Sequence, residues 1–363
     1  MKVVHVETGR HLYGGALQVA YLLRGLRDQY PGVESVLVCP PESAIAVAAQ
    51  DYAHRIVCLP MRGDLDVKFV FGLKRILRAE RPNILHLHSR RGADLWGGIA
   101  GRWCRIPTLL TRRVDNSEPR SWVAIKYRMY NHVAAISNGI RDLLLDQGLR
   151  SNKVTCVHSA TDTDQYHPGG DRRWFNQEFG LTSDHVVAGV IAQLIDRKGH
   201  RFLFDALPNL VRRHPEVRVL IFGKGPIEQK LRRHVARLSL NSYVIFAGFR
   251  PDMDRILPCL DLVVHPALIE GLGVSLLQAS ACEVPIIASN AGGMPEVVCD
   301  EHNGLLVPSG DSNALEGAMD RLIPDAALRQ RMGRNGRVLV RQKFSISQMT
   351  AGNHKIYERL LTQ

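Results

Sequence analysis

The chain has 363 residues, of which 45% are hydrophobic and 23% are charged, and its formal net charge is +12. This composition is typical of a soluble globular protein, and the length is enough for two domains with cores of their own. No apolar run approaches the roughly eighteen residues that a membrane-spanning helix needs. The first residues turn acidic too soon for a signal peptide, so we expect none.

The seven cysteines form no C-x-x-C pair. Their odd number and scattered spacing predict free thiols in a reducing compartment and no structural zinc. The segment 1–165 carries 23 Lys and Arg against 15 Asp and Glu, so most of the basic excess lies in this half. A basic surface can face anionic lipid, nucleic acid or an acidic small molecule, or it can serve solubility alone.

The first half alternates short apolar runs with helical patterns such as 16–26 and 67–79. This alternation is typical of a doubly wound α/β sheet. The expected strands are 2–6, 35–39, 55–59, 84–88, 108–111, 133–136 and 153–157.

Gly14 and Gly15 lie between the first predicted strand and the first predicted helix. Glycines at a helix start let an anion approach the backbone N–H groups closely. A plain tight turn is the alternative interpretation, and the two glycines do not decide between them.

His86 and His88 stand at the end of the fourth predicted strand and point to the same side of it. No third ligand is predicted nearby, so we expect no metal there. Ser89, Arg90 and Arg91 follow at a carboxyl strand end, where open α/β sheets line their ligand cleft. They are expected to meet an acceptor or a phosphate group.

The segment 119–130 mixes basic and aromatic side chains. One interpretation is an amphipathic helix that lies on a membrane surface. The other is a helix that packs Trp122, Ile125 and Met129 on its own core and exposes a basic face.

The segment 158–170 is expected to connect two domains, and the pattern then starts again. The expected strands of the second half are 186–191, 217–222, 243–246, 262–265 and 285–288, and the tail 345–361 is helical in pattern. Gly223-Lys224-Gly225 lacks the third glycine of a dinucleotide fingerprint, because position 228 is Glu228. Three Asp-x-Asp matches, at 64–66, 162–164 and 252–254, are interpreted as structural.

The stretch from His265 to Val298 organises the chain. Glu270-Gly271-Leu272-Gly273 follows an apolar strand and precedes an apolar helix, and Gln278 lies about two turns into that helix. The free N–H groups and partial positive charge of a first helical turn favour phosphate oxygens. Arg197 and Lys198 follow another buried strand, and by themselves they would be interpreted as an exposed loop pair.

This stretch resembles the donor site of retaining nucleotide-sugar glycosyltransferases of family 4 (glycosyl transferases group 1), which have the GT-B fold. The family pattern is a Glu, seven residues, a second Glu, then Ala-x-Ala/Ser, Pro-Val/Ile and Gly-Gly. The matching positions are Glu270, Gln278, Ala279, Ala281, Pro285, Ile286, Gly292, Gly293 and Glu296, with Gln278 in place of the second Glu.

The resemblance implies a role for each matching residue. Glu270 would hold the donor sugar, and Lys198 with Arg197 would neutralise its diphosphate; these three are the candidate catalytic residues. The candidate donor-binding residues are Gly14, Gly15, Gln193, Gly271, Leu272, Gly273 and Gln278. The candidate acceptor residues are His88, Arg90, Arg91 and Arg113, the last standing where many relatives have a functional histidine.

The resemblance also implies two Rossmann-like domains that face a cleft. Residues 1–162 would bind the acceptor, 163–344 the donor nucleotide, and the helix in 345–363 would cross back to the first domain. The implied enzyme is a hexosyltransferase that uses a nucleotide diphosphate sugar (a UDP-sugar is favoured over a GDP-sugar) with retention, and with neither a cofactor nor a metal.

The expected acceptor is a glycan or lipid-linked molecule of cell-surface polysaccharide or lipopolysaccharide synthesis. The expected location is the cytoplasm at the inner face of the membrane, with contact to anionic lipid and none to nucleic acid. Gln278 and Gln193 motivate one alternative, a catalytically weak relative that binds a nucleotide or a glycan. A nucleotide-sugar epimerase of similar fold is a second alternative, which the Glu270 stretch disfavours.

Overall fold

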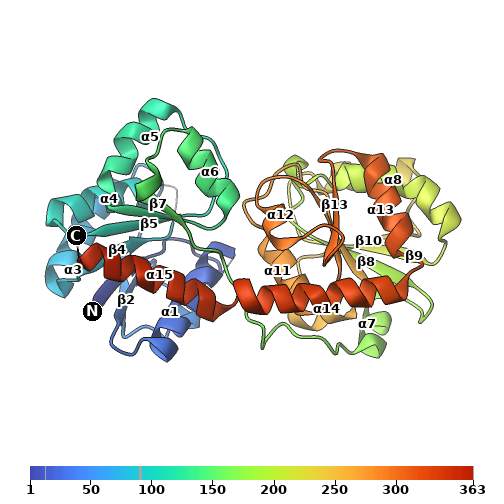
Figure 1. Cartoon of the computed structure of the whole chain (residues 1–363), viewed down its shortest axis with the longest axis horizontal. Helices are drawn as coiled ribbons and strands as arrows, with labels where there is room; N and C mark the ends of the chain where they lie inside the picture. The colour runs from blue at the N-terminus through green and yellow to red at the C-terminus, as the bar shows by residue number, and fades with distance from the viewer. Residues whose placement is uncertain (13, 90–91, 363) are drawn as a thin grey trace. The chain divides into compact units, whose positions relative to one another are not determined.

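The computed structural model describes residues 1–12, 14–89 and 92–362. The chain divides into two compact units (Figure 1). Unit 1 comprises Met1–Ala160 and Ile346–Gln363, and unit 2 comprises Thr161–Ser345. Each unit is a parallel sheet between layers of helices.

The sheet of unit 1 has seven parallel strands in the order β3-β2-β1-β4-β5-β6-β7. Its five central strands are almost entirely buried, which explains their continuous apolar character. The chain reverses its direction of winding between β1 and β4, and ligands bind at such a switch point in open α/β sheets. The strands are β1 (Lys2–Val6), β2 (Glu34–Cys39), β3 (Arg55–Cys58), β4 (Ile84–Leu87), β5 (Thr108–Arg112), β6 (His132–Ala135) and β7 (Val154–Cys156).

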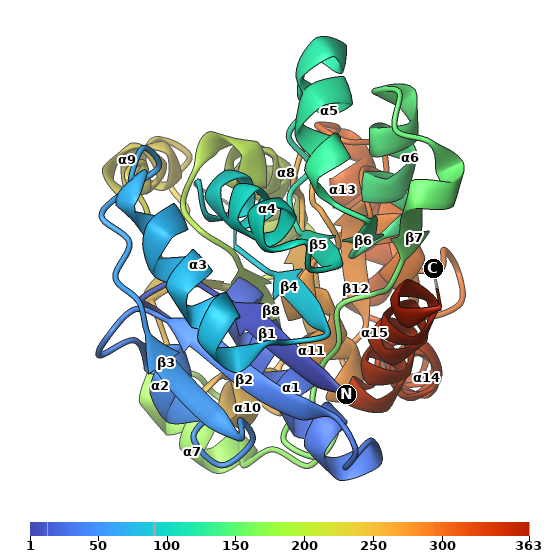
Figure 2. The same cartoon turned by 90° about the vertical axis from the view of Figure 1, so that its left-hand side faces the viewer.

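Helices cover both faces of this sheet, with α3 and α4 on one face and α1 and α15 on the other (Figure 2). Helix α15 belongs to unit 1 because Met349, Ile356 and Tyr357 enter one apolar core with Leu22 and Leu26 of α1. The helices are α1 (Gly14–Gln29), α2 (Ala44–Ala48), α3 (Lys68–Glu80), α4 (Ala93–Cys104), α5 (Arg120–Lys126), α6 (Asn138–Asp146) and α15 (Ile346–Leu361), with short 3-10 turns η1 (Tyr127–Met129) and η2 (Ser151–Lys153).

The sheet of unit 2 has six parallel strands in the order β10-β9-β8-β11-β12-β13, with its switch point between β8 and β11. One large apolar core packs α8 and α13 onto this sheet. The strands are β8 (Val186–Ile191), β9 (Val217–Phe222), β10 (Val244–Gly248), β11 (Leu262–His265), β12 (Ile286–Ser289) and β13 (Gly304–Val307).

The longest helices of unit 2 are α8 and α14. The helices are α7 (Arg172–Phe179), α8 (His200–Arg213), α9 (Glu228–Arg237), α10 (Met253–Ile256), α11 (Val274–Ala281), α12 (Met294–Val297), α13 (Ser312–Leu322) and α14 (Ala326–Lys343), with 3-10 turns η3 (Asp196–Lys198) and η4 (Leu257–Cys259).

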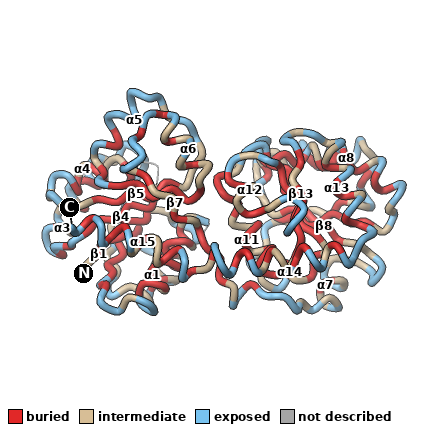
Figure 3. The backbone as a smooth tube through the Cα atoms, in the orientation of Figure 1, coloured by how far each residue is buried: buried red, intermediate tan, exposed pale blue. Residues whose placement is uncertain are grey.

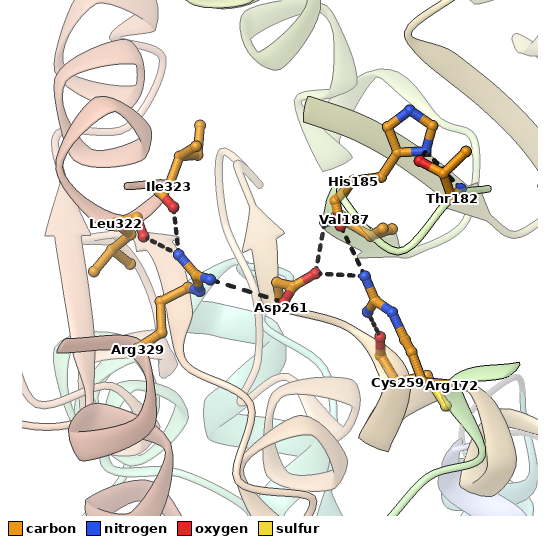
Figure 4. Close-up of polar contacts among 9 residues, drawn as sticks. All are labelled: Arg172, Thr182, His185, Val187, Cys259, Asp261, Leu322, Ile323 and Arg329. Carbon is orange, nitrogen blue, oxygen red and sulfur yellow. Dashed lines mark hydrogen bonds and ion pairs between the residues drawn. The ribbon is translucent and has the colours of Figure 1, made fainter. Parts of the chain in front are cut away.

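Asp261 fixes the start of β11, the strand that leads to the Glu270 loop (Figure 4). Its Oδ2 accepts hydrogen bonds from Arg172 Nη2 at 3.0 Å and from the Val187 amide at 2.8 Å. Arg329 of α14 lies 3.9 Å from its other oxygen. One carboxylate therefore ties α7, β8 and α14 to β11, and charge-assisted bonds of this kind are stronger than neutral ones.

A buried ion-pair network holds the segment between β5 and α5. Lys126 Nζ lies 2.6 Å from Asp94 Oδ2 and 3.0 Å from Glu118 Oε1, and Arg112 Nη1 lies 3.4 Å from Glu118 Oε2. Glu118 has the most exposed side chain of the four, and it is only 9% exposed. Tyr127 also donates to Glu118 at 3.0 Å. Arg112 and Lys126 therefore belong to the interior of unit 1.

Of the two interpretations of segment 119–130, the one that packs Trp122 and Ile125 on the core is wrong. Helix α5 buries Val123 and Lys126, whereas Trp122 and Ile125 are 40% and 62% exposed. Figure 3 shows that most of α5 is exposed. Lys126, rather than these apolar side chains, enters the interior, where it pairs with Asp94 and Glu118.

The seven cysteines are free thiols, as predicted. Among the described residues, no helix combines the length and the apolar character that crossing a membrane requires.

Candidate active site

Glu270 and Lys198 meet at the switch point of unit 2. Glu270 lies in the loop after β11, and Lys198 lies in η3 after β8, so the two neighbouring strands deliver them to one edge of the sheet. Lys198 Nζ contacts Glu270 Oε2 directly. His265 Nε2, at the end of β11, lies 3.2 Å from the same oxygen. The Gly271 amide donates to the other oxygen at 3.2 Å.

The Glu270 carboxylate is held in its charged form. Burial by itself would raise the pKa of Glu270, but the hydrogen bond from His265 and the charge of Lys198 outweigh this and hold the pKa well below its usual range. A carboxylate that stays ionised over the whole physiological range can accept hydrogen bonds from sugar hydroxyl groups.

Gly292 and Gly293 set the position of the Glu270 loop. Gly292 has a φ of +58°, and a Cβ atom there would lie 2.2 Å from the Glu270 carbonyl oxygen. A Cβ on Gly293 would lie 2.3 Å from the carbonyl oxygen of Gly271. The Gly293 amide donates to the Glu270 carbonyl at 2.9 Å. The pattern needs two glycines here because two backbone segments lie in contact.

The other expected donor residues of unit 2 lie in the segments after β8 and β11 and in α11. Gln193 and Arg197 are exposed, Gly271, Leu272 and Gly273 are buried, and Gln278 is half-buried. The hydroxyl of Tyr166 hydrogen-bonds to Gln278, while burial raises the pKa of Tyr166 to about 12. Gln278 thus pairs with a neutral hydroxyl group.

Two histidines beside the pair did not enter the sequence-based list. His265 contacts Glu270, and its Nδ1 is buried without a hydrogen-bond partner among the described residues. His200, the first residue of α8, is 1% exposed, and burial lowers its pKa to about 4. His265 is the last residue of β11, and His200 is the first residue of α8. These positions could have identified them as candidate site residues.

In unit 1, Gly14 and Gly15 form the first turn of α1, whereas the sequence placed them before the helix. Neither has a positive φ, and a Cβ there would meet open space at Gly14 and an ordinary contact with Arg113 at Gly15. Internal packing therefore does not require glycine at these two positions. A tight turn does not explain them either, since both residues lie inside α1. Their expected contact with the donor stays a prediction.

Arg113, at the end of β5, is half-buried beside Gly15. Its Nε has no hydrogen-bond partner among the described residues. Burial lowers the pKa of Arg113 to about 10, against the opposing charge of Glu7, so the guanidinium stays charged. Arg90 and Arg91 lie outside the described residues.

The comparisons with known proteins decide the family. The model described as "Glycosyltransferase Family 4" matches residues 13–165, and "Glycosyl transferases group 1" matches residues 171–339. A GDP-mannose-dependent alpha-(1-6)-phosphatidylinositol monomannoside mannosyltransferase of Mycolicibacterium smegmatis is 34% identical over 295 residues, 76% of this chain and 72% of that protein. The chain belongs to the group 1, family 4 glycosyltransferases.

Two further likenesses bear on this glycosyltransferase. The crystal structure of Anabaena HepE in complex with UDP and glucose has a TM-score of 0.86 at 20% identity and covers 99% of this chain and 100% of that one. It confirms the expected GT-B fold. A UDP-Gal:alpha-D-GlcNAc-diphosphoundecaprenol alpha-1,3-galactosyltransferase of Escherichia coli is 23% identical over 297 residues, 77% of this chain and 76% of that protein.

The glycosyltransferase has a third histidine beside His86 and His88, so the argument that they lack a nearby partner is wrong. His5 of β1 shares a 3.1 Å hydrogen bond between its Nδ1 and His88 Nε2. Both ring nitrogens of His86 are engaged, with Tyr357 Oη at 2.6 Å and Thr111 Oγ1 at 2.7 Å. All three rings are buried. His88 was expected to contact the acceptor. This contact stays a prediction, and the burial of His88 does not support it.

The three histidines should make unit 1 less stable in mild acid. Burial lowers the pKa of His5 to about 3 and the pKa values of His86 and His88 well below 6.5. The unfolded chain therefore takes up protons first as the pH falls below 6.5, and stability is lost between pH 6.5 and about 3. At pH 5 the loss for His5 alone is about 2 kcal/mol.

Hydrogen exchange of the β1 and β4 amides at pH 7 and pH 5, corrected for intrinsic rates, measures this loss. The interval avoids Glu118, whose lowered pKa places its titration below pH 4.5. A His5→Gln variant should depend less on pH in this interval. Equal protection of the wild type at the two pH values would contradict the neutral histidine cluster.

Proposed function

We propose that this glycosyltransferase transfers a hexose from a nucleotide diphosphate sugar, with retention at the anomeric carbon, to a lipid-linked or polysaccharide acceptor. The contact between Lys198 and Glu270 at the switch point of unit 2 carries the proposal. In this proposal Lys198 would meet the diphosphate, and the ionised carboxylate of Glu270 would meet the sugar.

Cleavage of the sugar–phosphate bond places negative charge on the leaving diphosphate. Lys198, Arg197 and the amides at the start of α11 would stabilise that charge, and fixed groups do so best where water is excluded. Glu270 would hold the sugar hydroxyl groups. Because no protein nucleophile is assigned, the leaving phosphate would take the proton of the acceptor hydroxyl. The acceptor oxygen would then bond to the anomeric carbon on the face from which the phosphate departs, which retains the configuration.

The relatives guide the choice of substrates for the test. One relative is named for GDP-mannose and a phosphatidylinositol mannoside, and another for UDP-Gal and a diphosphoundecaprenol-linked sugar. We therefore propose a lipid-linked acceptor in cell-surface glycan synthesis. GDP-mannose and UDP-hexoses should come first among the donors tested.

The test is release of nucleoside diphosphate from this donor panel, in a lipid extract with and without EDTA. The proposal predicts acceptor-dependent release from one donor that continues in EDTA, since protein cations would serve the diphosphate. An absolute need for a divalent metal would contradict this scheme. Tight donor binding with no release from any donor would favour the weakly active relative.

Lys198→Ala should weaken nucleoside diphosphate binding by about tenfold or more and leave nucleoside binding nearly unchanged, because a charge-assisted contact to phosphate contributes about 1.5–3 kcal/mol. Calorimetry with each ligand measures the two affinities. Lys230→Ala is the matched control, since Lys230 is exposed and pairs with Asp196 at 3.0 Å. Equal losses for nucleotide and nucleoside would place Lys198 away from the phosphates.

The proposed place of work is the cytoplasmic face of a membrane, where a lipid-linked acceptor would be found. The exposed Trp122 and Ile125 on α5 and the basic excess of the segment 1–165 support this location.

A further inference from the structure

Unit 1 has a cavity of about 440 Å³ lined by four basic side chains and no acidic one. It lies beside the amino ends of β5, β6 and β7, at the sheet edge opposite the strand ends that carry Gly14 and Arg113. Ile106, Pro107 and Met129 give it apolar walls. The four cations are Arg102, Arg105, Arg128 and Lys153, and the cavity is called the basic groove below.

Among the described residues, none of the four cations of the basic groove has an ion-pair partner. Burial, then the charges of Arg150 and Arg102, lower the pKa of Lys153, so its nearest charged neighbours repel it. A cavity lined by charges of one sign attracts ions of the opposite sign. Binding of an anion here would relieve the repulsion among the four cations.

The backbone holds the groove in shape. Lys153 Nζ donates to the Tyr130 carbonyl at 3.1 Å, and Arg102 Nη1 donates to the Arg128 carbonyl at 3.5 Å. Tyr130 is anchored in turn, because its hydroxyl donates to the Asp94 carbonyl at 3.0 Å. Tyr130 therefore connects the groove to Asp94, which belongs to the buried ion-pair network around Lys126.

A second cavity of about 390 Å³ shares Arg128 and Lys153 with the basic groove and reaches Val123 and Ala124 of α5. The exposed large apolar side chains of that helix are Trp122 and Ile125. A free inorganic anion would need no apolar neighbour. A phospholipid offers a phosphate for the groove and an apolar interface for an aromatic and an aliphatic side chain.

We propose that the basic groove binds the phosphate of an anionic phospholipid headgroup and docks unit 1 on a membrane surface, with Trp122 and Ile125 at the lipid interface. This site deepens the membrane location proposed above and rests on it. It is separate from the donor site, since it uses none of the residues assigned to the donor or the acceptor.

The test is sedimentation of the full chain with vesicles of phosphatidylcholine, alone or with phosphatidylglycerol. We expect binding only to the anionic vesicles. Arg105→Glu/Arg128→Glu should weaken it by at least about tenfold, because each cation near an anionic leaflet contributes measurably to binding. Arg331→Glu/Arg334→Glu makes the same charge change on α14 of unit 2, at two exposed positions, and should bind nearly as the wild type.

Arg105→Lys/Arg128→Lys should retain binding, and Trp122→Ala/Ile125→Ala should weaken it without changing its salt dependence. Circular dichroism checks that each variant folds. Nucleoside diphosphate release with a water-soluble acceptor should be unchanged in the groove variant, so failure of this site and failure of the transferase proposal can be told apart. Equal losses in the Arg331/Arg334 control, or thermal stabilisation by inorganic phosphate without any vesicle binding, would overturn the proposal.

Discussion

Glu270→Gln is expected to lower kcat/KM for sugar transfer by roughly two to three decades and to leave the fold intact. The substitution keeps the shape of the side chain and removes the charge that would meet the sugar hydroxyl groups in the transition state. Loss of one such charged interaction costs about 2–4 kcal/mol. Initial rates of nucleoside diphosphate release measure the effect, and circular dichroism checks the fold.

Asp196→Asn is the matched control, because it removes a carboxylate close to Lys198 in the chain. Asp196 is exposed and pairs with Lys230, so its loss should change the rate less than about threefold. Near wild-type transfer by a folded Glu270→Gln variant would remove Glu270 from the mechanism.

Lys126→Met should destabilise unit 1 by about 3–5 kcal/mol, because the change leaves Asp94 and Glu118 buried as carboxylates with one cation fewer, and breaking a buried pair costs more than removing it whole. Because α5 and the segment after β5 depend on this network, hydrogen exchange in β5 and α5 should rise first.

Lys68→Met is the control for this change, since Lys68 is exposed at the start of α3 and should alter stability by less than about 0.5 kcal/mol. If Lys126→Met were as stable as Lys68→Met, the close contacts of Lys126 with Asp94 and Glu118 would carry no energy. The ion-pair network would then not be what holds the segment between β5 and α5.

The sheets could be predicted because buried parallel strands appear as short apolar runs. β1, β8, β9 and β11 have the predicted bounds. β13 (Gly304–Val307) was missed, since it follows a polar turn and is too short to show a period. The contact between Lys198 and Glu270 could be anticipated from the family pattern alone, because the two residues lie far apart in the chain.

Other contacts join side chains that lie far apart in the sequence, and no local sequence pattern predicts them. His5 meets His88 only because β1 and β4 are neighbours in the sheet. Lys126 looked like a surface cation because helical spacing does not show a carboxylate that comes from another helix, here Asp94 of α4. Of the two open interpretations of α5, the one that placed Trp122 and Ile125 inside is wrong, because both lie outside.

Proton NMR of the anomeric signals during one transfer reaction shows whether the sugar is transferred with retention and whether transfer needs Glu270. The enzyme is incubated with GDP-mannose or a UDP-hexose, and the acceptor is the lipid extract that supports nucleotide release. We expect the donor signal to disappear and a product signal of the same anomeric configuration to replace it, in the wild type and not in Glu270→Gln. A product of inverted configuration, or equal conversion by both proteins, would contradict this expectation.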